Sequence, residues 1–310
     1  MSAARAPDAS IRQLVGVVVI LLTGVMAVLL SGCAERSPMA SHSGRVPVEV
    51  WTIEDWSHVP VRLTSPDARP GTFLDARAIV ADARGRIHVS DAGRHAILYA
   101  DPHADRPLEW SILGGPGADQ GQFMAPEGLD VDAGSILGVA DTGNGRIQRF
   151  TRGGAIMEII QMEPRMPADV RYVQALADGT LFILTDTEPF LFRMDRIREQ
   201  VSPVYLVEQA MPVDMARFGN GLAVLDASGT LHVLSSAGVT VRRLTGIPFI
   251  FIDPIQSGLI ARTGPVLWVF NARLEPVEAW QLPDSMDSRG AAVSGADLLV
   301  ISRTHLHRLP

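Results

Sequence analysis

The sequence predicts an all-β domain built from repeated four-stranded units, and two observations predict it. The first is a run of three short apolar segments, at residues 128–131, 136–140 and 146–150, separated by turns rich in Asp, Asn or Gly. Val, Ile, Leu and Phe favour strands, whereas Gly, Asn and Asp supply turn geometry. The second is that the middle segment recurs along the chain, as expected for repeated units of about 40 residues.

Six copies of this middle segment lie at intervals of 37 to 50 residues. In chain order, the copies end in Asp91, Asp141, Asp186, Asp226, Thr263 and Arg303. A carboxylate at the end of a strand commonly accepts backbone N–H bonds from the adjoining turn. Because the Asp recurs in successive units, we expect it to be structural rather than part of a site.

The segment at residues 123–150 resembles the NHL repeat, with the pattern F-x-x-P-x-G followed by A-D-T-x-N-x-R-I-Q-x-F. This resemblance implies a six-bladed β-propeller over residues 46–310, with one blade for each copy. The last blade contains only three predicted strands before Pro310. We therefore expect the strand-like run at residues 46–53 to supply the missing strand and to close the ring.

Residues 1–32 have the features of a secretory signal peptide. Arg5 and Arg12 precede an uncharged, mostly apolar run of 17 residues at positions 14–30. The alternative is an uncleaved signal anchor, because a run of about this length is close to the shortest that spans a bilayer.

The Leu-Ser-Gly-Cys sequence that ends at Cys33 resembles the bacterial lipobox. The resemblance implies that Cys33 is lipidated and becomes the mature N-terminus, which would attach the protein to a membrane. Residues 33–45 then form a lipidated, flexible tether. We expect a location in the bacterial cell envelope, on the periplasmic or extracellular side, and at the outer membrane if the organism has one.

The charge of the chain narrows the class of partner, and its cysteine content excludes one kind of covalent cross-link. The chain has 34 acidic and 27 basic side chains, for a net charge of −7, and it contains one cysteine. An acidic protein outside the cytoplasm is not expected to bind nucleic acid. A lone cysteine excludes an internal disulfide.

The face on which the innermost strands begin is the usual binding surface of a propeller. With Glu127 as the reference, the equivalent positions are Arg77, Glu127, Tyr172, Pro212, Phe249 and Arg289. Six-bladed gluconolactonase-like hydrolases gather Glu, Asp and Asn around a divalent cation, and lyases with NHL-like blades use His around zinc. A cation site needs several such ligands, and this ring offers one carboxylate. We therefore expect no metal, no cofactor and no catalytic residue.

Polar residues near this face are the candidates for contact with a ligand or a partner. They are Arg77, Arg94, His95, Glu127, Asn144, Arg146, Tyr172 and Arg289. Arg presents a planar fork of donors suited to carboxylates. Two alternatives stay open, namely that Arg77, Glu127 and Arg289 pair with one another and that Arg146, as part of the repeat pattern, is structural. We interpret His88 and His232, which lie within predicted strands, as structural.

These observations favour a membrane-anchored, non-catalytic binding module for a protein partner or a small anionic ligand. The alternative is a metal-dependent lactonase-like hydrolase or an NHL-type lyase with a divergent channel site. A third interpretation is a structural member of an envelope complex.

Overall fold

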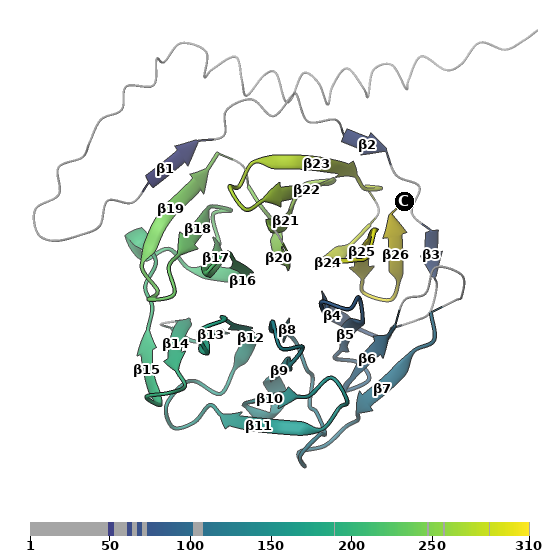
Figure 1. Cartoon of the computed structure of the whole chain (residues 1–310), viewed down its shortest axis with the longest axis vertical. Helices are drawn as coiled ribbons and strands as arrows, with labels where there is room; N and C mark the ends of the chain where they lie inside the picture. Colours follow the sequence, from purple (N-terminus) through teal and green to yellow (C-terminus); the bar gives the residue numbers. More distant parts are fainter. Residues whose placement is uncertain are drawn as a thin grey trace, which may run out of the picture. The chain divides into compact units, whose positions relative to one another are not determined.

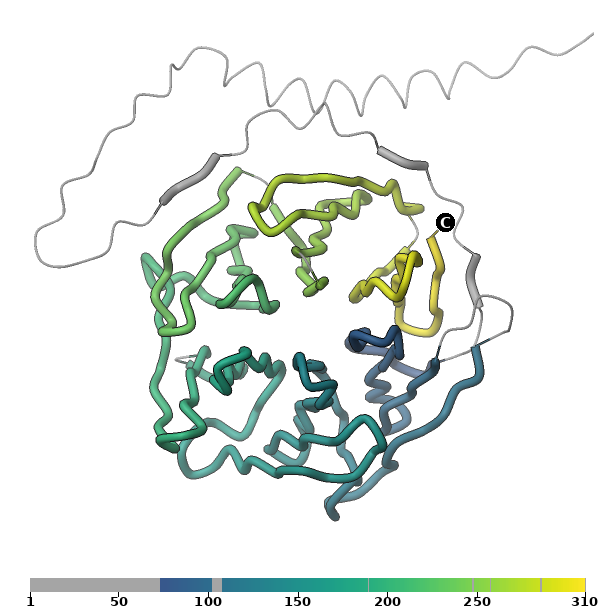
Figure 2. Tube along the Cα trace, in the orientation of Figure 1, coloured from purple at the N-terminus to yellow at the C-terminus, as the bar shows by residue number. Residues whose placement is uncertain are grey.

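The structure, a computed structural model, shows six sheets arranged as blades around a central axis (Figure 1 and Figure 2). The prediction of an all-β six-bladed propeller is confirmed. The residues described are 49–52, 61–63 and 67–69, for which only the backbone is considered, and 73–101, 108–188, 190–246, 248–256, 258–284 and 286–309. The predicted signal peptide and tether lie outside these ranges. Within the same ranges, no helix is long and apolar enough to cross a bilayer.

In each blade the strands follow the chain outward, so that the first strand is innermost (Figure 1). Blade 1 contains β4 (Ala76–Ala81), β5 (Ile87–Asp91), β6 (Ala96–Ala100) and β7 (Ser111–Gly114). Blade 2 contains β8 (Leu129–Val131), β9 (Leu137–Asp141), β10 (Arg146–Phe150) and β11 (Ile156–Gln161). Blade 3 contains β12 (Val170–Ala175), β13 (Thr180–Thr185), β14 (Leu191–Asp195) and β15 (Gln200–Pro203).

The second half of the ring follows the same plan. Blade 4 contains β16 (Pro212–Phe218), β17 (Gly221–Asp226), β18 (Leu231–Leu234) and β19 (Thr240–Thr245). Blade 5 contains β20 (Phe251–Ile255), β21 (Gly258–Thr263), β22 (Val266–Asn271) and β23 (Pro276–Gln281). Blade 6 contains β24 (Ser288–Ser294), β25 (Asp297–Ser302) and β26 (Leu306–Leu309). The recurring segment found in the sequence forms the second strand of every blade.

Three short strands ahead of blade 1 pair with other blades. β1 (Glu49–Thr52) is parallel to β19 of blade 4, and β2 (Val61–Leu63) is parallel to β23 of blade 5. β3 (Asp67–Arg69) is antiparallel to β26 of blade 6. Our expectation that residues 46–53 complete blade 6 is therefore corrected, because the strand within that run lies beside blade 4. The Asp-Ala-Arg sequence of β3 pairs through its backbone, which requires no apolar pattern.

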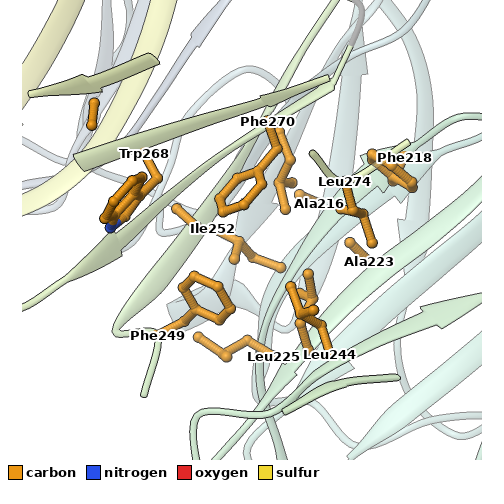
Figure 3. Packing of buried hydrophobic residues seen from close by; sticks show 14 residues of the cluster. Ala216, Phe218, Ala223, Leu225, Leu244, Phe249, Ile252, Trp268, Phe270 and Leu274 are labelled. Carbon is orange, nitrogen blue, oxygen red and sulfur yellow. The ribbon is translucent and has the colours of Figure 1, made fainter. Parts of the chain in front are cut away.

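Apolar side chains between neighbouring blades hold the ring together. Six buried clusters lie one at each seam, and the cluster between blades 6 and 1 includes Ile79 of β4 and Ile301 of β25. At the seam of blades 4 and 5, Phe249 meets Phe270 edge to face with 6.0 Å between ring centroids (Figure 3). Each fully buried side chain of this size contributes about 1.5–3 kcal/mol. The seams are thus a main source of stability.

Gly128 lies where the innermost segments of blades 2 and 3 touch. Its N–H donates to the carbonyl of Arg171 at 2.7 Å. A Cβ at this position would lie 2.4 Å from that oxygen, which is too close for any residue except glycine. The glycine of the NHL-like pattern therefore permits direct contact between two blades.

Side chains also join the innermost strands directly. Each of these strands pairs within its blade on one side only, which leaves backbone N–H groups on the other edge in need of acceptors. Side chains of the preceding blade accept four of these N–H groups, at donor–acceptor distances of 2.7 to 3.0 Å. Asp130 accepts from Ala175, Gln174 from Arg217, Asp214 from Ile252, and Asp253 from Ala291. These contacts link blades 2 to 6 in succession.

Three of the four acceptors are carboxylates, and their environment raises their pKa values. Burial raises the pKa of Asp130 to about 6 and that of Asp214 to about 7. Burial, together with the charge of Asp214, raises the pKa of Asp253 well above its usual value. In the unfolded chain, an Asp side chain has a pKa of about 3.9. Between that pH and the folded pKa values, the folded state binds more protons, so the free energy of unfolding falls as the pH rises.

The Asp253→Asn variant tests this pH dependence. Asn keeps an oxygen that can accept the Ala291 N–H, and it removes a carboxylate whose ionisation is disfavoured beside Asp214. We predict that Tm rises by about 2–4 °C at pH 8, which is about 1 kcal/mol for a domain of this size, and changes little at pH 4. Thermal unfolding followed by circular dichroism provides the measurement, with the exposed Asp284→Asn as the control. An unchanged slope of Tm against pH in Asp253→Asn would contradict the prediction.

Candidate functional site

We define the entry face as the face on which the innermost strands begin and the second strands end. Four innermost strands open there with a shift in pairing register that leaves one residue extra. The extra residues are Arg77, Arg171, Val213 and Arg289. A β-bulge leaves its extra residue unpaired and re-aims its side chain. Three of the four bulges therefore present an arginine at the mouth of the ring.

The structure places the predicted ring of residues partly as expected. The residues at the mouth are Arg77, Glu127, Arg171, Val213, Ile250 and Arg289. In blades 3 to 5 they lie one residue away from the positions inferred from the sequence. Pro212 and Phe249 are buried and Tyr172 is half-buried. Bulges cause this shift in blades 3 and 4, and they have no clear signature in the sequence.

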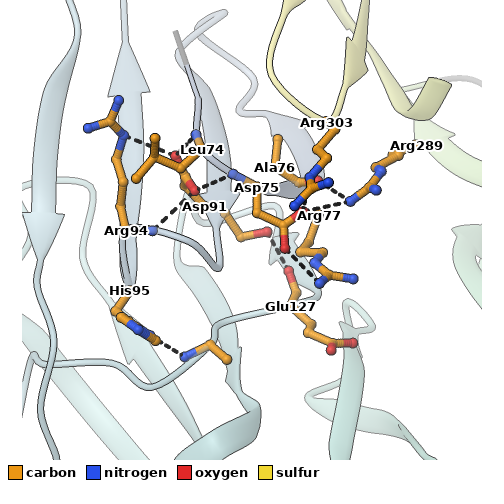
Figure 4. A network of polar contacts seen from close by, with 12 residues as sticks. Leu74, Asp75, Ala76, Arg77, Asp91, Arg94, His95, Glu127, Arg289 and Arg303 are labelled. Atoms are coloured by element: carbon orange, nitrogen blue, oxygen red, sulfur yellow. Dashed lines mark hydrogen bonds and ion pairs between the residues drawn. The ribbon is translucent and has the colours of Figure 1, made fainter. Parts of the chain in front are cut away.

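Asp75 gathers three arginines at the seam between blades 6 and 1 (Figure 4). Its Oδ2 lies 2.7 Å from Nη2 of Arg77. Its Oδ1 lies 2.8 Å from Nη1 of Arg289 and 3.4 Å from Nε of Arg303. Arg303 occupies the place in blade 6 where the recurring Asp stands in blades 1 to 4. Sequence reasoning missed both Asp75 and Arg303, although the position of Asp75 two residues before Arg77 offered a signal.

Glu127 has a different partner. Its Oε2 lies 3.2 Å from Nε of Arg171, and Nη1 of Arg171 lies 3.2 Å from Oδ1 of Asp186. Rim pairing thus occurs, but the partners are Asp75 and Arg171 rather than the predicted candidates pairing among themselves. Asp186 also differs from the recurring Asp91, Asp141 and Asp226, because its side chain is exposed whereas theirs are buried.

The best-preserved repeat converges on one buried carboxylate. Asp141 accepts the N–H of Met124 and the Nε–H of Arg146, each at 2.8 Å, and the amide of Asn144 at 2.9 Å. The buried Arg146 also donates to backbone carbonyls in the loop at residues 118–122. Asn144 and Arg146 are therefore engaged within the protein. Asp141 has the structural role that we predicted.

Blade 1 repeats this arrangement in simpler form. Asp91 accepts the N–H groups of Leu74 and Asp75, each at 2.9 Å, and its Oδ2 lies 3.1 Å from Nε of the half-buried Arg94. Nδ1 of His95 accepts the N–H of Ala125 at 2.9 Å, which leaves Nε2 as the donor of the neutral ring. Arg94 and His95 thus help to hold the loops of blades 1 and 2 in place.

The two histidines predicted to be structural lie buried inside blades 1 and 4. Nε2 of His232 lies 2.8 Å from Oδ2 of Asp226. Burial lowers the pKa of His88 to about 4, so that its ring is neutral at physiological pH. Among the residues that the structure describes, no three His, Cys, Asp or Glu side chains lie close enough together to hold a metal ion.

Large apolar side chains are exposed on the entry face. Leu74, Met124, Met211 and Ile250 each lie shortly before an innermost strand, and they are 40% to 54% exposed. Tyr205, which follows β15, is exposed near the same face. Sequence reasoning missed these residues, because an apolar residue next to a strand cannot be distinguished from a core residue without knowing where the blade seams lie.

The sequence matches no protein-family model and no curated protein. Solved structures with a similar fold include virginiamycin B lyase from Staphylococcus aureus, with a TM-score of 0.58 and 11% identity over 79% of this chain and 98% of that one. A gluconolactonase from Xanthomonas campestris has a TM-score of 0.60 and 14% identity over 81% of this chain and 91% of that one. A chain of a nidogen/laminin complex has a TM-score of 0.55 and 13% identity over 72% and 86%. At these identities the likeness shows the propeller fold alone.

Proposed function

We propose that the protein is a membrane-anchored, non-catalytic binding module whose entry face holds a protein partner. The observation that carries this proposal is the composition of that face. Arg77 and Arg289, each from a bulge, lie on the same face as the exposed apolar residues Leu74, Met124, Met211 and Ile250. Arg, Met and aromatic residues are enriched at protein–protein interfaces, and the four apolar residues share the entry face with these arginines.

The similar structures agree with a binding role without deciding it. One comes from a nidogen/laminin complex, whereas others are a lyase and a gluconolactonase. The same fold therefore serves in protein complexes and in enzymes, and the function has to be argued from the residues of the site. A small anionic ligand is a second candidate for the same face, because Arg77 and Arg289 present planar donor forks.

Cys33 would hold this module at a membrane, with the ring on the periplasmic or extracellular side. The lipobox-like ending at Cys33 and the apolar run before it support this proposal. Closure of blade 6 by a strand from the N-terminal segment belongs to the same proposal, and the pairing of β3 with β26 supports it. Such closure would join the tethered end of the chain to the last blade.

Replacing exposed apolar residues by Asp tests the entry face. The partner is recovered by co-purification with the tagged full-length protein from detergent-solubilised envelopes. We predict that the double variant Met211→Asp with Ile250→Asp recovers at least about tenfold less partner than the wild-type protein. Both side chains are exposed, so the fold should persist. Val277→Asp is the matched control, because Val277 is 55% exposed at the start of β23 on the opposite face. A partner retained by the double variant, or lost only from the control, would contradict the proposal.

Metal analysis separates this function from the hydrolase or lyase alternative. We expect no stoichiometric Ca or Zn in the purified full-length protein, because Glu127 is the only carboxylate among the six residues at the mouth and it pairs with Arg171. The alternative predicts a bound metal that Glu127→Ala abolishes and that the exposed Glu188→Ala retains. Finding such a metal would overturn the non-catalytic assignment.

The Cys33→Ser variant tests the anchor. We predict that it no longer incorporates radiolabelled palmitate, because the thiol that accepts the lipid is missing. Ser37→Ala, in the predicted tether, should label normally. Equal labelling of the Cys33→Ser variant and the wild-type protein would rule out lipidation at this residue.

A further inference from the structure

We propose that Arg77, Arg289 and Arg303, which we call the arginine triad, bind a carboxylate of an acidic segment in the protein partner. This inference rests on the proposed function and names the chemistry that the entry face would recognise. The triad comes from three strand ends or bulges in two blades, and Asp75 lies at its centre (Figure 4).

Charge is not balanced within the triad. Three guanidinium groups surround Asp75, and one further carboxylate, Asp287, lies 3.4 Å from Nε of Arg289. Among the residues that the structure describes, these pairs leave one positive charge in excess, in a chain whose net charge is −7. An additional carboxylate would neutralise the cluster.

The triad also has donors to offer. Arg77 contacts Asp75 through Nη2, and Arg303 contacts it through Nε. Their side chains are 43% and 64% exposed, whereas that of Arg289 is 26% exposed. A guanidinium carries five N–H donors in a planar fork that matches a carboxylate. Arg77 and Arg303 therefore present donor edges that a ligand can reach.

Asp75 fixes the geometry of the triad. Its N–H is bound by Oδ1 of the buried Asp91 at 2.9 Å, and Nη1 of Arg289 also donates to the carbonyl of Ala76 at 3.3 Å. These contacts hold like charges together before any ligand arrives. Such preorganisation lowers the cost of ordering side chains when a partner binds.

Arg171 provides an internal comparison. It occupies the same kind of bulge on the same face, but two carboxylates, Glu127 and Asp186, lie 3.2 Å from its guanidinium. These carboxylates already compensate the positive charge of Arg171. If a carboxylate ligand binds at the entry face, the triad should recognise it and Arg171 should not.

The surroundings of the triad favour a protein segment over a small anion. Small-molecule sites usually enclose most of their ligand, whereas Arg77 and Arg303 are open to solvent. Leu74, 54% exposed, directly precedes Asp75 and offers an apolar contact next to the charges. The overall negative charge of the chain would disfavour an acidic segment elsewhere on its surface, which adds to specificity.

Binding of a fluorescein-labelled hexaglutamate peptide to the full-length protein in detergent, measured by anisotropy at low ionic strength, tests the inference. We expect saturable binding that weakens as salt is added, and no binding of hexaglutamine. The double variant Arg77→Gln with Arg303→Gln should bind at least about tenfold more weakly, with a Tm close to that of the wild-type protein. Arg171→Gln is the matched control and should bind within about twofold of wild type, because its charge is already compensated.

Three results would overturn the inference: no binding of hexaglutamate to the wild-type protein, equal binding by the double variant, or equal weakening by Arg171→Gln. Displacement of the peptide by an equal concentration of succinate would assign the site to a small dicarboxylate instead. These results are separable from failure of the proposed function. A partner that is lost from the Met211→Asp, Ile250→Asp variant but kept by the arginine variants would leave the binding module intact and remove only the carboxylate site.

Discussion

The unpaired edges of the innermost strands are the constraint on which the rest of the ring depends. Each innermost strand has a neighbour within its blade on one side only, and a buried N–H without an acceptor is costly. Asp130, Gln174, Asp214 and Asp253 meet this need from one blade to the next. The buried carboxylates Asp130, Asp214 and Asp253 thus serve the scaffold. They hold the blades in register at the cost of raised pKa values.

With the inner carboxylates in use, groups available for recognition lie at the mouth of the ring. Bulges at the start of the innermost strands place Arg77, Arg171 and Arg289 there. Arginines placed by the same kind of bulge differ in how far nearby carboxylates neutralise their charge. Arg171 stands between two carboxylates, whereas Arg77 and Arg289 share Asp75 with Arg303. Charge compensation therefore distinguishes one part of the entry face from another.

The sequence allowed the strands to be predicted well where one residue pattern repeats. The second strand of every blade and the structural role of Asp141 follow from apolar runs that end at turn residues. The site was less predictable, because bulges shift the side chains by one residue in blades 3 and 4 and depend on contacts between strands. Asp75 and Arg303 are 228 positions apart in the sequence, and only closure of the ring brings them together. The pairing of β3 was missed because it involves backbone groups.

Site-specific photo-cross-linking in cells tests the central claim, that the entry face holds a protein partner, most directly. A photoreactive amino acid at Met124 on the entry face and another at Val277 on the opposite face compare two exposed positions of the same ring. The account predicts that Met124 yields a discrete adduct with a second protein and that Val277 yields none. Adducts from Val277 alone, or none from either position, would contradict it.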